Sequence, residues 1–348
     1  MSDAYARSGV DTGDAGRAVA ALVGVLRTID AGRPSRVVPL PGHFASVIEI
    51  APGLGLALCT DGVGSKVIVA EQAQRYDTVG IDCIAMNVND LVCVGAEPLA
   101  VLDYLAVERA DPKVAEALGR GLKAGAEAAG VEIPGGELAV LPELLQPHGQ
   151  GGLAFDLVAA AVGTVALDAI VSGADCAPGD ALIGLPSSGV HSNGLTLARR
   201  ALLEDGGLAL DDRPDELGGL TVADALLEPT VIYVRAVLEL LRSDVAVHGL
   251  AHITGDGLDN LLRLNPDVGF DVAEPLPVPG VFDLIARCGG VSPAEMWQIF
   301  NMGCGFCAIV AAAECDAAVE ILARHHPGTR RIGTVTDRAG AVTHPALA

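Results

Sequence analysis

The chain has 348 residues, of which 51% are hydrophobic, and a formal net charge of −22. This length predicts about two domains of roughly 100–200 residues each, and the acidity argues against nucleic acid and anionic membranes as partners. No apolar run reaches the roughly 18–20 residues of a membrane span, and the N-terminus has no hydrophobic signal core. We therefore expect a cytoplasmic protein. Its eight cysteines show no disulfide spacing, and we expect Cys304 and Cys307 to be buried as small apolar residues.

The first half of the chain alternates patterns typical of strands and helices. In chain order these are a helix at 17–29, strands at 37–40, 46–51 and 54–60, a helix at 83–96, a strand at 97–108, a helix at 111–130, and strands at 136–143 and 155–165. This mixture predicts an α/β fold, although its β-rich opening is not that of a doubly wound sheet.

The stretch 166–180 is rich in Gly, Pro and Asp and predicts a boundary between domains 1–168 and 169–348. The second half again mixes both kinds of element: a strand at 181–189, helices at 193–204, 222–228 and 230–243, a strand at 269–277, helices at 281–288 and 293–299, a strand at 305–312, a helix at 315–325 and a strand at 329–337. We therefore expect two α/β domains of similar length.

The segment TDGVGSK brings an acid, two glycines and a lysine together after a buried strand. Asp61 ends that strand, Gly62 and Gly64 allow a ligand to approach the backbone, and Lys66 can add a charge to a phosphate. The spacing is not that of a Walker loop. By itself the segment fits either a phosphate site or a surface turn with a salt bridge.

A second segment, GIDCIAMNVNDLVCVGAEP, places Asp82, Asn89 and Asp90 in or beside an apolar helix, where such residues are unfavourable. Asn87 and Asp90 share a helix face because they are three residues apart. A third acid, Glu137, follows a glycine pair. Carboxylate and amide oxygens suit Mg²⁺ that also binds nucleotide phosphates. The alternative is a helix cap with an internal polar network.

Two glycine-rich loops in the second half each contain a histidine. GLPSSGVHSNGLTLARR precedes a helix, so Ser192 or Asn193 could cap it and its N-terminus could bind an anion. AHITGDGLDNLL repeats the pattern with His252 and Thr254. A structural role for such loops is the alternative to ligand binding.

Together these segments resemble phosphoribosylformylglycinamidine cyclo-ligase, also called AIR synthetase. The resemblance runs from about residue 5 to 335 and depends on YARSGVD, DGVGSK, the Asn/Asp-containing helix, GGE, GVHSNG, LLEPTVIYV, AHITGDGL and MWQIFNMGCGF. GVHSNG together with NMGCGF and the Asn/Asp helix is its most specific part.

The resemblance implies a fold, partners and a reaction. The fold is a two-domain α/β chain whose N-terminal sheet joins that of a second subunit in a barrel-like homodimer. The reaction uses ATP and Mg²⁺ to close the imidazole ring of a phosphorylated small molecule, formylglycinamidine ribonucleotide, in purine synthesis. The formyl oxygen attacks the γ-phosphate, and an internal nitrogen then displaces that phosphate, which requires mainly positioning and charge neutralisation.

The resemblance also implies roles for residues. The nucleotide-binding set is Asp61, Gly62, Gly64, Ser65, Lys66, Asp82, Asn89, Gly136 and Glu137, and the metal ligands among the acids are Asp61, Asp82, Asp90 and Glu137. The substrate-binding set is Ser188, Gly189, His191, Ser192, Asn193, Thr254 and Gly255. Lys66, Asp90 and His191 are the expected catalytic residues, and His191 is assigned to substrate contact or proton transfer.

The chain departs from the family pattern at three places. Where the family has GGETAEMP, this chain has GGELAVLP, with Leu138 and Val140. TGGG is replaced by TGDG, which contains Asp256, and a glycine-rich GGFGG near 42–46 is replaced by PGHFAS. Asp256 would repel a substrate phosphate if it pointed inward. The alternatives are another enzyme of the superfamily (thiamine-monophosphate kinase, selenide water dikinase or the hydrogenase-maturation carbamoyl dehydratase) or a non-catalytic nucleotide-binding paralogue.

Overall fold

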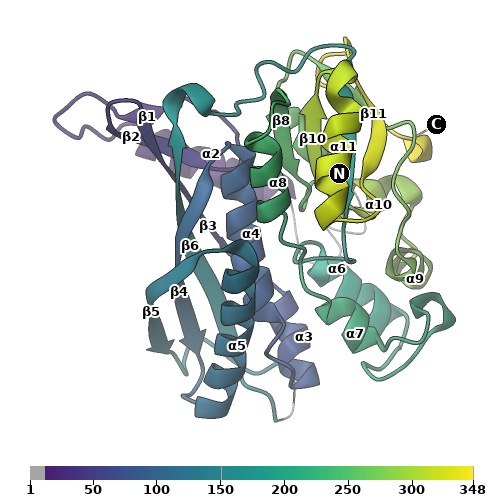
Figure 1. Ribbon diagram of the computed structural model, residues 1–348. Coiled ribbons are helices and arrows are strands. Elements are labelled where there is room, and N and C mark those ends of the chain that lie inside the picture. Colours follow the sequence, from purple (N-terminus) through teal and green to yellow (C-terminus); the bar gives the residue numbers. More distant parts are fainter. Residues whose placement is uncertain (1–11, 150, 348) are drawn as a thin grey trace.

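The computed structural model describes residues 12–149 and 151–347, and they form two six-stranded sheets with helices between and around them (Figure 1). The YARSGVD segment lies outside the described residues. The first sheet has the order β1-β2-β3-β6-β4-β5 and the second the order β12-β9-β11-β7-β10-β8. The predicted two-domain α/β fold is confirmed, and both sheets are mixed rather than doubly wound.

The first sheet is antiparallel except where β4 and β5 run parallel. Its strands are β1 (Val37–Val38), β2 (Ser46–Ala51), β3 (Leu54–Gly62), β4 (Glu97–Val107), β5 (Glu132–Val140) and β6 (Phe155–Ala166). The parallel pair is joined by helix α5 (Pro112–Ala129), which Asp111 caps by accepting hydrogen bonds from two backbone N–H groups.

Helices α4 (Val79–Cys93) and α5 lie on one face of this sheet (Figure 1). The two helices touch because Gly80 and Gly121 lack side chains: a Cβ atom on Gly80 would lie 2.3 Å from the backbone nitrogen of Leu122. Strand β6 shows the resulting two-sided pattern, since Leu157, Ala159 and Ala161 are buried under the helices and alternate with less buried residues.

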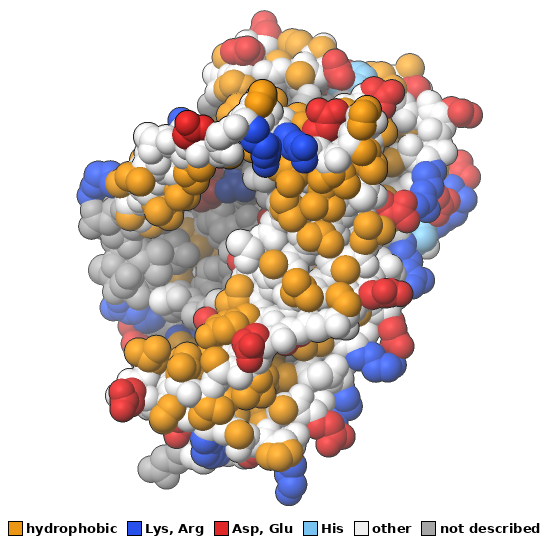
Figure 2. Space-filling model, turned by 90° about the vertical axis from the view of Figure 1, so that its left-hand side faces the viewer, with side chains coloured by type: hydrophobic (Ala, Val, Ile, Leu, Met, Phe, Trp, Pro, Cys, Tyr) orange, Lys and Arg blue, Asp and Glu red, His pale blue; other side chains and the backbone are white. Residues whose placement is uncertain are grey.

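The opposite face of the first sheet is open and apolar. Leu102 and Tyr104 on β4 remain 52% and 41% exposed, and Ile50 on β2 is 44% exposed. Figure 2 shows hydrophobic side chains gathered on this side of the molecule. Exposed apolar patches of this kind mark interaction surfaces.

The second sheet consists of β7 (Ala181–Pro186), β8 (Val247–His252), β9 (Gly269–Asp271), β10 (Cys304–Val310), β11 (Arg330–Thr336) and β12 (Val342–Thr343). It is antiparallel except for the β9–β12 pair. Every residue of β10 is buried. Cys304 and Cys307 are free thiols within this strand, as predicted, with their sulfur atoms 3.6 Å apart.

The helices of the second half are α6 (Leu195–Arg199), which continues as a π-helical turn over Arg200–Asp205, α7 (Val222–Leu227), α8 (Val234–Leu241), α9 (Gly280–Gly289), α10 (Pro293–Ile299) and α11 (Cys315–His325). Capping boxes start two of them: Thr221 with Asp224 at α7, and Ser292 with Glu295 at α10. No helix in the described ranges has the length and apolar character needed to cross a bilayer.

Helix α4 is buried between the first sheet on one side and β8 and α8 on the other (Figure 1). The two halves also meet at the surface, where Arg75, two residues after the end of α3 (Lys66–Ala73), pairs with Asp224 on α7 at 2.6 Å. The polar side chains of α4 therefore lie at the contact between the two halves.

Several predicted boundaries were wrong. A helix was predicted at 230–243, but α8 begins at Val234, and residues 228–233 form an irregular strap that crosses from α7 to α8. Pro229 disfavours a helical Glu228, and the polar contacts of the strap replace helical hydrogen bonds. Helix α3 was not predicted, and the N-terminal helix α2 spans Thr12–Leu26 rather than 17–29.

Candidate active site

A buried ion pair lies at the centre of the contact between the halves. Lys66 is the first residue of α3 and lies two residues after Gly64. The φ of Gly64 is +68°, a backbone conformation that residues with a side chain rarely adopt. This turn directs Lys66 Nζ to within 2.9 Å of Asp82 Oδ1 on α4, and both side chains are fully buried. Nζ also donates to the carbonyl of Glu228 at 2.6 Å. Such a pair persists only when further hydrogen bonds satisfy it.

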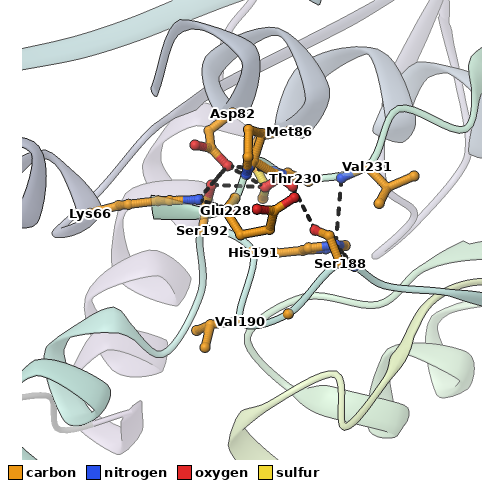
Figure 3. A network of polar contacts seen from close by, with 12 residues as sticks. Lys66, Asp82, Met86, Ser188, Val190, His191, Ser192, Glu228, Thr230 and Val231 are labelled. Carbon is orange, nitrogen blue, oxygen red and sulfur yellow. Dashed lines mark hydrogen bonds and ion pairs between the residues drawn. The ribbon is translucent and has the colours of Figure 1, made fainter. Parts of the chain in front are cut away.

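The second half supplies the remaining partners of Asp82 (Figure 3). Its Oδ1 atom accepts from the backbone N–H of Thr230 at 2.8 Å, from the Thr230 hydroxyl at 2.6 Å and from the Ser192 hydroxyl at 3.2 Å. Its Oδ2 atom is buried and has no hydrogen-bond partner in the part of the chain that the structure describes. The ion pair thus joins α3 and α4 to the strap 228–233 and to the GVHSNG loop.

The strap is held along most of its length. The Ser188 hydroxyl donates to the carbonyl of Pro229 at 2.6 Å. Asn89 on α4 donates to the carbonyl of Val231 and accepts from the backbone N–H of Tyr233, both at 2.9 Å. Asn89 is therefore a buried positioning residue in this structure.

His191 lies beside the strap in a left-handed backbone conformation, with φ of +63°. Its Nε2 atom accepts from the backbone N–H of Ser188 at 3.2 Å and from that of Val231 at 3.5 Å. Its Nδ1 atom is buried and has no partner within residues 12–149 and 151–347. Burial, and then the electrostatic effect of the basic side chains of His252 and Lys66, holds the pKa of His191 well below its usual value.

Asp90 on α4 pairs with a histidine of the second half. Its Oδ1 atom lies 2.8 Å from Nδ1 of His252, which is buried on β8, and Asn89 Nδ2 lies 3.4 Å from Nε2 of the same ring. His252 was noted in the sequence but not assigned to the site. Its spacing from Asp90 gave no signal, because 162 residues separate them.

Asp61 and Asp103 lie in one cross-strand row. Both pair with Ala159 of the intervening strand β6, so all three side chains point toward the same face, the one that α4 covers. Burial raises the pKa of both carboxyls, and the negative charge of Asp90 adds to the effect on Asp61. Asp103 was missed in the sequence because it lies inside a strand rather than after one.

Gly136 continues this row, since it pairs with Asp103, and a Cβ atom there would lie 2.2 Å from an Asp103 oxygen. The next residue, Glu137, therefore points to the opposite, open face. It pairs with Tyr104 on β4, is exposed, and accepts from the backbone N–H of Leu138 at 3.0 Å. The structure thus brings Gly136, but not the Glu137 side chain, to the face of the other acids.

The polar loops of the second half lie close together. Asn301 donates to the carbonyls of Gly189 and Val190 and accepts from the Ser187 hydroxyl, so the NMGCGF turn fixes the loop that carries His191. A Cβ atom on Gly255 would lie 3.2 Å from Asn193 Oδ1. Asn301 was not identified from the sequence, because only the glycines of the NMGCGF segment were considered.

The remaining predicted residues have local partners. Ser65 accepts from the Thr196 hydroxyl at 2.9 Å, Asn193 donates to Met86 Sδ at 3.9 Å, and Thr254 donates to Asn260 at 3.3 Å.

Asp256, the departure from TGGG, does not point into the protein. Its side chain is 65% exposed and lies 3.8 Å from Arg263. The repulsion that an inward Asp256 would exert on a substrate phosphate is therefore absent from this arrangement.

Acidic groups that could meet a cation are present, but their environments differ. Within 12–149 and 151–347, no three Asp, Glu, His or Cys side chains are grouped so that they could hold a metal ion on their own. Asp82 uses Oδ1 for Lys66 and three other donors. Asp61 and Asp90 fit a cation better, because burial, and to a lesser degree the charge of Asp90, raises the pKa of Asp61, and a nearby cation would stabilise the charged carboxylates. Nucleotide phosphates would then supply the remaining ligands.

Comparison with known protein families agrees with this architecture. The model for the N-terminal domain of AIR synthase related proteins matches residues 42–165, and the model for the C-terminal domain matches residues 177–344.

Solved structures show the same fold at low identity. The hydrogenase maturation protein HypE in complex with ATP has a TM-score of 0.59 at 22% identity, covering 82% of this chain and 80% of its own. The structure described as AaThiL complexed with AMPPCP and TMP has a TM-score of 0.60 at 18% identity, covering 88% of each chain. At these identities the likeness establishes the fold alone.

Curated relatives are much more similar in sequence. The phosphoribosylformylglycinamidine cyclo-ligase of Methanothermobacter thermautotrophicus is 48% identical over 341 residues, which cover 97% of this chain and 96% of the relative. The proteins of the same name from Thermococcus gammatolerans and Pyrococcus furiosus are 46% and 43% identical, with the same coverage. The chain belongs to the phosphoribosylformylglycinamidine cyclo-ligase, or AIR synthetase, family.

Proposed function

We propose that the protein catalyses the ATP-dependent ring closure of formylglycinamidine ribonucleotide to 5-aminoimidazole ribonucleotide, with release of ADP and phosphate. The observation that carries this proposal is the 48% identity to a cyclo-ligase over 97% of the chain. The likeness to HypE and AaThiL reaches only 22% and 18% identity and does not favour their activities.

The proposed reaction has two displacement steps. The formyl oxygen attacks the γ-phosphorus of ATP, and the bond to ADP breaks. The internal nitrogen then attacks the formyl carbon, the carbon–oxygen bond to phosphate breaks, and the nitrogen loses a proton. Phosphoryl transfer of this kind depends on positioning and on charge neutralisation.

We assign the nucleotide to the face of the first sheet that carries Asp61, next to α4. Asp61 and Asp90 would hold Mg²⁺, and Asp103 and the backbone at Gly136 border them. When bound, Mg²⁺ would neutralise phosphate charge. Ser65 and the glycines around it would lie at the phosphates.

Lys66 and Asp82 differ from the other candidates because they already neutralise each other. Their pairing at 2.9 Å in a fully buried position supports a role in joining the two halves and positioning the strap 228–233. A direct contact of Lys66 with phosphate would first require this pair to open. Glu137 would meet the nucleotide only from the open face of the sheet, and thus from the side of a second subunit.

The substrate would bind where the second half meets α4. Ser188 and Gly189 line a cavity of about 140 Å³ whose wall also includes Glu228 and Val281. His191, Ser192 and Asn193 continue from this loop toward α4. We assign Thr254 and Gly255 to the same site, because Gly255 lies beside Asn193.

We also propose a homodimer formed through the open face of the first sheet. The support is the row of exposed apolar side chains, including Leu102 and Tyr104, on a face that no helix of the described chain covers. A cytoplasmic location, with the cysteines kept as free thiols, agrees with this metabolic role.

The proposal is tested by a coupled assay for aminoimidazole ribonucleotide. Purified protein with ATP, Mg²⁺ and formylglycinamidine ribonucleotide should form ADP and product in equal amounts, and omission of Mg²⁺ should abolish turnover. Turnover of ATP with thiamine monophosphate, and none with the formyl ribonucleotide, would overturn it.

A further inference from the structure

The hydrogen bonds around His191 determine where its ring carries a proton. Two backbone N–H groups, of Ser188 and Val231, point at Nε2 from 3.2 and 3.5 Å. A backbone N–H can only donate, so Nε2 must accept and cannot carry a hydrogen. The proton of the neutral ring therefore lies on Nδ1.

The surroundings of the ring also disfavour its charged form. His191 is buried, and the two side chains that act on it electrostatically, His252 from β8 and Lys66 from α3, are both basic. The ring also lies near β10, since a Cβ atom on Gly305 would be 2.7 Å from His191 Cε1 and 2.1 Å from the Tyr233 hydroxyl. Burial and these basic neighbours lower the pKa of His191, so the ring remains neutral near pH 7.

The ring of His252 carries its proton on the same nitrogen, but there the proton has an acceptor. The backbone N–H of Tyr233 donates to Asn89 Oδ1, so the Asn89 Nδ2 amide group is the donor that faces His252 Nε2. His252 therefore also carries its proton on Nδ1, and it donates that proton to Asp90 at 2.8 Å. The equivalent N–H of His191 is buried and has no acceptor among the residues that the structure describes.

We propose that His191 is a neutral hydrogen-bond donor that binds an oxygen atom of the substrate through Nδ1–H and takes no proton during ring closure. This inference rests on the proposed function and assigns one role of that site. An orphaned buried N–H costs free energy unless a ligand or a water accepts from it, and the substrate offers formyl and phosphate oxygens. The proton that ring closure releases would leave by another group.

Long-range proton–nitrogen NMR tests the tautomer without measuring activity. In ¹⁵N-histidine-labelled full-length protein, the His191 ring should show a protonated Nδ1, an unprotonated Nε2, and no titration between about pH 6 and 8, in contrast to an ordinary histidine. Formylglycinamidine ribonucleotide alone should shift the Nδ1 signal downfield. A ring that titrates in this range, or a shift caused only by a non-hydrolysable ATP analogue, would overturn the proposal.

Two variants test the role in turnover. Asn tolerates a left-handed backbone and places an amide N–H near the position of Nδ1, but it cannot act as a base. Gly tolerates the same backbone and has no donor. We expect H191N to retain kcat/KM within about 10-fold of the parent enzyme and H191G to lose at least about 100-fold. Equal losses in both variants, with folding intact, would indicate proton transfer instead.

The two proposals can fail separately. If the parent enzyme forms no aminoimidazole ribonucleotide, the proposed function fails, whatever the NMR shows. If it does form product while His191 titrates with an Nε2 proton, only the donor role is wrong.

Discussion

At the scale of single residues, burial and neighbouring charges give the acids of the site different roles. Asp82 is neutralised by Lys66 at 2.9 Å, whereas burial, and to a lesser degree the charge of Asp90, raises the pKa of Asp61. The sequence predicted that all of these acids would surround a metal ion. It could not distinguish them, because the partner of Asp82 depends on how α3 folds back toward α4.

Substitution of Asp61 by Asn tests the cation site. Asn keeps the shape of the side chain but removes its charge, so we expect kcat to fall at least about 100-fold with little change in the free energy of unfolding. D168N, on an exposed turn after β6, is the matched control and should leave kcat unchanged. Near-normal kcat in D61N would show that the triphosphate binds elsewhere.

His326 gives a pH-dependent contribution to stability. Burial, and then the charge of His325, lowers the pKa of His326 to about 4 from 6.5. The unfolded chain therefore binds a proton between pH 6.5 and about 4 that the folded protein excludes, and this contribution to stability is lost as the pH falls through that window.

Urea unfolding of the parent protein and H326Q at pH 7.5 and near pH 4.5 tests this sign. The free energy of unfolding of the parent should fall relative to that of H326Q at the lower pH. The comparison with a variant is needed because the carboxyls of Asp61, Asp103 and Asp259, whose pKa values are raised, act in the opposite direction. If the free energies of unfolding of the parent and H326Q differed by the same amount at both pH values, the lowered pKa of His326 would be contradicted.

At the scale of elements, sequence reasoning missed the strap 228–233, helix α3 and strands β8 and β12. The hydrophobic pattern located α4, α5 and most strands of the two sheets, because it reports which face of an element is buried. It carries no information on a segment whose conformation is fixed by Asp82, Asn89 and Lys66 from the other half of the chain. The sequence located the two glycine-rich loops of the second half, but only the folded structure shows which residues they contact.

The contact between α3, α4 and the strap predicts a large stability effect. K66M leaves the Asp82 carboxylate buried without its cation and should lower the free energy of unfolding by roughly 3–5 kcal/mol. The double variant K66M/D82N should lose less than the sum of the two single variants, because it removes both charges. Additive losses in urea unfolding would mean that the two residues do not stabilise each other.

At the scale of the whole molecule, the exposed apolar face of the first sheet predicts self-association. L102E places a charge on this face and should convert a dimer to a monomer in light scattering after size-exclusion chromatography. L220E alters a residue of similar exposure, 50%, in the second half of the chain and should remain dimeric. A dimer in both variants would place the interface elsewhere.

The central claim is that ATP binds where the first sheet meets α4. A crystal structure with a non-hydrolysable ATP analogue and Mg²⁺ tests it most directly. We expect the triphosphate beside Asp61 and Asp90, with a magnesium ion bound to at least one of their carboxylates and the Lys66–Asp82 pair intact. A triphosphate bound away from both carboxylates would contradict the account.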